Sequence, residues 1–234
     1  QGCHQIEGLE NEKIGPELLR VGSKVRPEWV PRWLREPRGL RPTTRMPHFT
    51  LLTDQEIAAL TAYLLSTRDE SFLASYGRKL PGNGSAAAGG ALFAELGCNG
   101  CHTVQGEGGD FAPDLSDVGA KVNSAWLYRW LRNPKDYRTD TRMPNFRLTD
   151  DQIEDLGAFL LALRGRHPGS SAPRARQPGS PALVQKGKRL LGEKGCTGCH
   201  RVASDVPVIF AAPELTEIGL KRSDDLEFGT VRAL

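Results

Sequence analysis

The sequence predicts an all-α fold made of three small repeated units, the third of them incomplete. A cysteine–histidine pair begins at Cys3, Cys101 and Cys199, so neighbouring pairs lie 98 residues apart. A fixed period of this kind indicates an internal repeat. The 234 residues include 26 Gly and 16 Pro and are 38% hydrophobic, a composition that suits several small domains better than one large core.

Each unit continues, after its Cys-His pair, with the same short elements in the same order. A Pro-acidic-Leu step lies within residues 15–18, 112–115 and 212–215. A hydrophobic-Gly-x-Lys step follows at residues 21–24, 118–121 and 218–221. The three units therefore align along this part of the chain.

The first two units then share a tryptophan-rich helix that ends at a proline, because proline cannot continue a helix. In both units two tryptophans are spaced i, i+4, which places them on one helix face. The pairs and their prolines are Trp29, Trp33 and Pro37, and Trp126, Trp130 and Pro134. We expect these tryptophans to be core residues or pocket walls.

A longer helix is expected to start at Thr53 in the first unit and at Thr149 in the second. The sequences TDQE and TDDQ are capping boxes, in which the Thr hydroxyl and the Glu or Gln side chain satisfy free backbone amides. An apolar stripe at helical spacing follows each box: Ile57, Leu60 and Leu64, and Ile153, Leu156 and Leu160. Short helical patterns at 89–97 and 187–195 precede the second and third Cys-His pairs.

Two polar stretches rich in Pro, Gly and Ser separate the units and are typical of linkers. The predicted organisation is a first domain, a linker, a second domain, a second linker and an incomplete third domain, at residues 1–66, 67–85, 86–164, 165–181 and 182–234. The chain contains no apolar run long enough to span a bilayer and no visible signal peptide. We expect it to be an interior fragment, cut at both ends. Its net charge of +3, without a long block of one sign, argues against nucleic-acid binding.

Residues 98–102 and 196–200 are C-x-x-C-H motifs, and Cys3-His4 matches the tail of a third copy. C-x-x-C-H is the haem-attachment signature of c-type cytochromes: two thiols on one turn add to the vinyl groups, and the adjacent His becomes the proximal iron ligand. For a lone C-x-x-C the alternatives are a zinc knuckle or a redox dithiol. Two copies at one period favour haem.

The chain has only two methionines, Met46 and Met143, which lie 42 and 41 residues after His4 and His102 in the same Arg-Met-Pro-x-Phe context. A low-spin electron carrier needs a second axial ligand, and in cytochromes c this is commonly Met. Packing in a core is the usual role of Met. The equivalent positions of the two methionines favour ligation.

These motifs make the chain similar to three tandem class I-type cytochrome c domains. The resemblance implies three covalently attached haem c groups, with iron ligands His4, Met46, His102, Met143 and His200 and attachment at Cys3, Cys98, Cys101, Cys196 and Cys199. It also implies that a proline carbonyl accepts a hydrogen bond from each proximal His; the matching residues are Pro16, Pro113 and Pro213. Arg45 and Arg142, which precede the methionines, are either propionate partners or solvated side chains.

The chain departs from the family pattern at two places. The first unit lacks its first cysteine, which by register would immediately precede Gln1. The third unit has no methionine, because only 34 residues follow His200. The sixth ligand of its haem therefore stays open between Met, His and none.

The function expected from the resemblance is electron transfer between a membrane oxidoreductase complex and an acceptor such as a terminal oxidase or reaction centre, with the protein itself not an enzyme. Covalent haem attachment implies a periplasmic or otherwise extracytoplasmic site, associated with a membrane complex of the respiratory chain. Two alternatives stay open: the cytochrome portion of a larger redox enzyme, and a haem enzyme with an open coordination site on the third haem.

Overall fold

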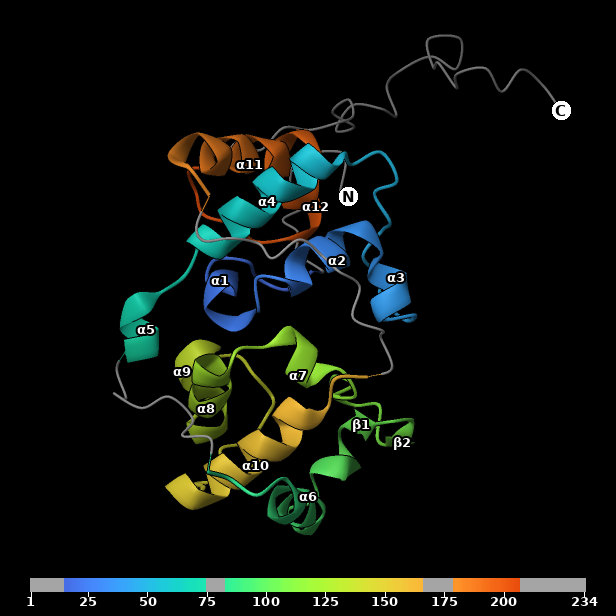
Figure 1. Ribbon diagram of the computed structural model, residues 1–234, viewed down its shortest axis with the longest axis vertical. Helices are drawn as coiled ribbons and strands as arrows, with labels where there is room; N and C mark the ends of the chain where they lie inside the picture. Colours follow the sequence, from blue (N-terminus) through green and yellow to red (C-terminus); the bar gives the residue numbers. More distant parts are fainter. Residues whose placement is uncertain (1–14, 75–82, 166–178, 207–234) are drawn as a thin grey trace, which may run out of the picture.

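The computed structural model describes residues 15–74, 83–165 and 179–206. Within these residues the protein is helical apart from one antiparallel pair of two-residue strands, β1 (Thr103–Val104) and β2 (Glu107–Gly108), so the predicted all-α class is confirmed. The helices form two lobes, one above the other in Figure 1, each with its own apolar core. None of the helices in the described ranges has both the length and the hydropathy that crossing a bilayer requires.

The central lobe consists of residues 83–165. In chain order its helices are α6 (Ala86–Glu95), the 3-10 turn η1 (Cys98–Gly100), α7 (Val118–Lys121), α8 (Ser124–Arg132), α9 (Pro134–Tyr137) and α10 (Asp150–Ala162). The predicted capping box begins α10: the Thr149 hydroxyl accepts a hydrogen bond from the Gln152 amide, and the Gln152 side chain accepts one from the Thr149 amide. Pro134 follows the end of α8 and starts α9, as its fixed φ allows.

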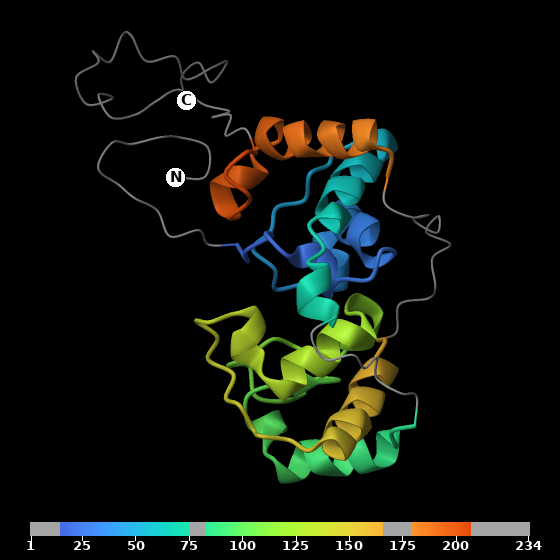
Figure 2. The same cartoon turned by 90° about the vertical axis from the view of Figure 1, so that its left-hand side faces the viewer.

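The composite lobe combines two stretches that are far apart in the sequence. Residues 15–68 contribute α1 (Val21–Lys24), α2 (Trp29–Arg35), α3 (Pro37–Leu40) and α4 (Asp54–Ser66). Residues 179–206 contribute α11 (Pro181–Glu193) and α12 (Cys196–Cys199). Figures 1 and 2 both show α11 lying across α4. The predicted capping box at Thr53 begins α4.

The predicted apolar stripes of α4 and α10 form the centres of the two cores. Ile57, Leu60 and Leu64 are buried in the composite lobe together with Leu190 and Leu191 of α11. In the central lobe the buried residues of α10 are Ile153, Leu156 and Leu160, which pack with Phe93 of α6 and Leu127 of α8. Burial of these side chains stabilises each lobe by roughly 1.5–3 kcal/mol per fully buried residue.

Both lobes are built around the same helix crossing. A Cβ atom at Gly89 of α6 would lie 2.0 Å from the backbone oxygen of Asp155 in α10, and one at Gly187 of α11 would lie 2.0 Å from that of Ala59 in α4. Only glycine lets two helix backbones approach so closely. Helix α11 therefore occupies on α4 the place that α6 occupies on α10.

The segments between the predicted domains are partly structured. Residues 67–85, expected to be a linker, contain α5 (Glu70–Ala74), whose Phe72 is buried in the core of the central lobe. Residues 182–206, expected to belong to a separate third domain, pack on the first unit. The domain boundaries of the sequence analysis remain predictions, because residues 1–14 and 207–234 lie outside the described part of the chain.

Candidate cofactor and metal site

The C-x-x-C-H motif of the central lobe forms a tight turn at the end of α6. Gly97 has a φ of +69°, in the left-handed region that glycine adopts without strain, and it turns the chain into η1. The amide of His102 donates a hydrogen bond to the carbonyl of Cys98 at 2.9 Å. Cys98 is half-buried and Cys101 is exposed, and neither forms a disulfide. One short turn therefore presents two thiols and the adjacent imidazole.

The ring of His102 is held by a backbone oxygen. Its Nδ1 lies 2.7 Å from the carbonyl oxygen of Pro113. A carbonyl can only accept, so Nδ1 carries the proton and Nε2 keeps a free lone pair. This is the contact that the sequence analysis expected of Pro113, and it is the usual way in which a metal-binding histidine is oriented.

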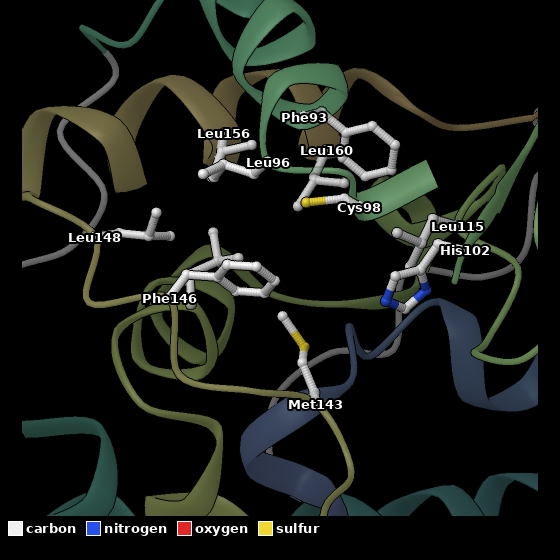
Figure 3. Close-up of a pocket in the computed structure, with 11 residues that line it drawn as sticks. Phe93, Leu96, Cys98, His102, Leu115, Met143, Phe146, Leu148, Leu156 and Leu160 are labelled. Carbon is white, nitrogen blue, oxygen red and sulfur yellow. The ribbon is translucent and has the colours of Figure 1, made fainter. Parts of the chain in front are cut away.

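An apolar pocket lies beside this histidine. Figure 3 shows the His102 ring and the Met143 thioether facing the same space, with Cys98 at its edge. The other lining residues are apolar and come from α6, α8, α10 and two loops: Phe93, Leu96, Leu115, Leu131, Phe146, Leu148, Leu156 and Leu160. The site thus combines an imidazole, a thioether and a thiol in apolar surroundings.

Met143 has a hydrogen-bond donor at its sulfur. The indole Nε1 of Trp130 donates to Met143 Sδ at 3.0 Å, and Trp126 stacks on Trp130 with ring centroids 5.1 Å apart. The composite lobe repeats the contact between Trp33 and Met46 at 2.8 Å. The sequence predicts core residues or pocket walls at these positions, and this contact with methionine was not among the predictions. The signal available was the spacing of 13 residues from tryptophan to methionine in both units.

The composite lobe builds a matching site from the third C-x-x-C-H motif and the first unit. His200 Nδ1 lies 2.7 Å from the carbonyl oxygen of Pro16. Gly15 donates its amide to Cys199 O, as Ala112 donates to Cys101 O in the central lobe. Leu18 likewise donates to Arg201 O and Leu115 to Thr103 O, all four at 2.8–2.9 Å. The same backbone register therefore joins each motif to its proline loop.

The methionine of the first unit lies in the same lobe as this motif. Met46 and Cys196 both pack against the core cluster of the composite lobe. The contact between His200 and Pro16 joins the third motif to the first unit in that lobe. Three of the predicted site residues, Cys3, His4 and Pro213, lie outside the described residues. Arg45 and Arg142 are exposed beside the methionines, and their role as propionate partners remains a prediction.

Burial shifts the pKa of the first thiol in each of the two described motifs. It raises the pKa of Cys98, and it raises the pKa of Cys196 to about 11. A raised pKa disfavours a redox dithiol, whose reactive form is the thiolate. Within the described ranges no three His, Cys, Asp or Glu side chains gather as a metal cluster.

The residues present fit haem c. Two thiols precede a histidine on one turn, the histidine keeps Nε2 free, a methionine faces the same space, and the walls are apolar. Each of these features matches what a covalently attached haem with a histidine ligand requires. The central lobe offers all of them within residues 93–160.

Comparisons with known proteins show the family of the chain. The chain matches the cytochrome c family description over residues 1–68 and 86–164. It is 35% identical over 69 residues to the C subunit of nitric oxide reductase from Stutzerimonas stutzeri, a match that covers 27% of this chain and 47% of that protein. The corresponding protein of Halomonas halodenitrificans is 32% identical over 85 residues, covering 32% and 57%. The chain spans about half the length of these relatives. No solved structure matches significantly.

Proposed function

We propose that this chain, which belongs to the cytochrome c family, is the electron-transfer part of a membrane-associated respiratory complex on the extracytoplasmic side. The observation that supports this most strongly is the central pocket, where His102, Met143 and Cys98 line one apolar space. Haem c, when bound, supplies one-electron redox chemistry, and the protein sets its potential and its access to water.

The residues of the central lobe have separate tasks in this proposal. His102 Nε2 and Met143 Sδ are the iron ligands, and Cys98 and Cys101 are the covalent attachment points. The Pro113 carbonyl holds the His102 ring in the tautomer that binds a metal. The apolar lining keeps water out, and a dry pocket with a methionine ligand favours a comparatively high potential.

For the composite lobe we propose His200 and Met46 as the ligand pair, with attachment at Cys196 and Cys199. The sequence analysis assigned Met46 to His4 instead. Both histidines cannot use the one methionine, and the contacts of Pro16 and Gly15 with the third motif support His200. A third haem at Cys3 and His4, as predicted from the sequence, would then need another sixth ligand. In this pairing the alternative of an open coordination site passes from the haem of His200 to the haem of His4.

The partner we propose is a membrane-bound oxidoreductase. The matched relatives are named as subunits of nitric oxide reductase, and this suggests a reductase core of that kind as the first acceptor to test. The reduced holoprotein should be reoxidised by membranes that contain such a reductase in the presence of nitric oxide. Reoxidation only by oxygen through an oxidase would redirect the proposal to a different acceptor.

The haem proposal is tested by the intact mass of the denatured holoprotein, produced in a host that attaches haem c. Covalent haem survives denaturation, so Cys98→Ala/Cys101→Ala and Cys196→Ala/Cys199→Ala should each remove the mass of one haem. His48→Ala, which changes a histidine outside both pockets, is the control and should remove none. A wild-type protein without covalent haem would overturn the proposal.

A further inference from the structure

A lysine of each lobe lies over a tryptophan of the other lobe, and the two lysines occupy equivalent positions in the repeat. Lys24 of the composite lobe places Nζ 4.6 Å from the ring centroid of Trp126 in the central lobe. Lys121 of the central lobe places Nζ 4.8 Å from the ring centroid of Trp29 in the composite lobe. Each ammonium also lies 5.9 Å from the second tryptophan of its pair. The contacts are thus reciprocal between the two repeats.

The backbone fixes both lysines at this interface. Lys24 O accepts a hydrogen bond from the Asn123 amide at 3.0 Å, and Lys121 O accepts one from the Arg26 amide at 2.8 Å. Val25 and Val122, the residues after the lysines, form an antiparallel bridge. The main chain at both lysines is therefore held at the contact between the two lobes.

The lysine ammonium groups are in an environment that is costly for a cation. Burial, followed by the charge of Lys121, lowers the pKa of Lys24 to about 7, and burial lowers the pKa of Lys121 to about 8. Among the described residues no ion pair involves either lysine. The negative ring faces of the tryptophans are the groups that offset the cost, since a desolvated cation over an indole is attracted to it.

Each tryptophan pair leads from the interface to a methionine. Lys24 lies over Trp126 and Trp130, and Trp130 donates to Met143 Sδ. Lys121 lies over Trp29 and Trp33, and Trp33 donates to Met46 Sδ. A charge in one lobe is therefore two contacts away from the proposed iron ligand of the other.

We propose that Lys24 and Lys121 are cross-lobe positioning residues that raise the reduction potential of the redox site in the opposite lobe. Each holds the tryptophan pair that donates to the opposite methionine and adds a positive charge beside it. Both effects favour the reduced form of a one-electron centre, whose net charge is lower. This proposal rests on the proposed haem function.

The test is a redox titration of the holoprotein at pH 6, where both ammonium groups are protonated, with each haem followed by the NMR signal of its methionine. Lys24→Met should lower the potential of the Met143 site and leave the Met46 site unchanged. The ratio of reduced to oxidised haem at a fixed potential should fall roughly two- to fivefold. Lys121→Met should do the reverse. Lys24→Arg should retain the wild-type value, and Lys135→Met, at an exposed lysine, is the control.

A shift in the lobe that carries the substitution, an equal shift in both, or no shift would overturn the proposal while leaving the haem function intact. The intact mass of the same sample separates the two claims. A protein without covalent haem would refute the proposed function, and the effect on the potential with it.

Discussion

At the scale of single residues, the sulfur of each methionine is the most informative atom. An indole N–H donates to it at 2.8 Å in one lobe and 3.0 Å in the other. A donor at a thioether withdraws electron density and makes it a weaker ligand for oxidised iron. Hydrogen bonds to ligands are a main lever by which a protein tunes a redox centre. If Met46 and Met143 bind iron as proposed, Trp33 and Trp130 act on the potential through them.

Replacing Trp130 by Phe keeps the aromatic stack and removes the donor. We expect the reduction potential of the Met143 site to fall by on the order of 30 mV. This corresponds to a hydrogen bond that is stronger in the reduced than in the oxidised state by part of its net free energy. Potentiometric titration measures the shift. Trp33→Phe is the matched variant and should move only the Met46 site. Unchanged potentials in both variants would show that these hydrogen bonds do not form when haem is bound.

At the scale of elements, two pairs of crossed helices position the sites. Helices α6 and α10 line the central pocket, and α11, which packs on α4, leads into the third C-x-x-C-H motif. The helix starts, the capping boxes and the apolar stripes were predictable, because Thr53 and Thr149 precede regular apolar spacing in the sequence. The partner of α11 was not predictable. Gly89 in α6 and Gly187 in α11 leave the same small contact surface, so the sequence does not decide which of these helices crosses α4 and which crosses α10.

The crossing depends on one glycine in each pair. Gly89→Ala should destabilise the central lobe by about 1–3 kcal/mol or more, since its Cβ would lie 2.0 Å from the Asp155 oxygen. Gly90→Ala is the control in the same helix. Its Cβ would meet only the Phe159 ring at 3.4 Å, and the higher helix propensity of Ala should leave stability equal or up to about 1 kcal/mol greater. Thermal unfolding of both variants decides the comparison, and equal losses would contradict the crossing.

Acid should weaken the contact between α11 and α4. The Lys194 ammonium lies 2.7 Å from the Glu56 carboxylate, and this hydrogen bond, more than any other contact, lowers the pKa of Glu56 from 4.5 to about 2. A carboxyl group whose pKa is lower in the folded state stabilises the fold above its unfolded pKa. The contribution is then lost as pH falls from about 4.5 to about 2.

Lys194→Met should raise the pKa of Glu56 while leaving its capping contact with Thr53 in place. NMR titration of the Glu56 carboxyl carbon measures this directly. The free energy of unfolding should fall less in the variant than in the wild type as the pH drops from about 4.5 to about 2. A Glu56 pKa that is the same with and without Lys194 would show that α11 does not pack on α4 in solution.

At the scale of the whole molecule, two lobes of similar construction face each other through reciprocal contacts. The sequence predicted the repeat, the haem motifs and the methionines, since these are local patterns with a fixed spacing. It could not predict that the third motif contacts Pro16 of the first unit, because Pro16 and Pro213 occupy equivalent positions in the repeat. Nor could it predict the interface, because Lys24 and Lys121 resemble ordinary surface lysines until their tryptophan partners are placed.

The most direct measurement is the proton NMR spectrum of the reduced holoprotein. A methionine bound to low-spin haem gives a methyl signal shifted strongly upfield by the ring current, and the chain has only two methionines. We predict two such signals, one lost in Met143→Ala and the other in Met46→Ala. Cys196→Ala/Cys199→Ala, which removes the haem of the third motif, should delete the Met46 signal alone. A Met46 signal that persists in that variant would contradict the pairing of Met46 with His200.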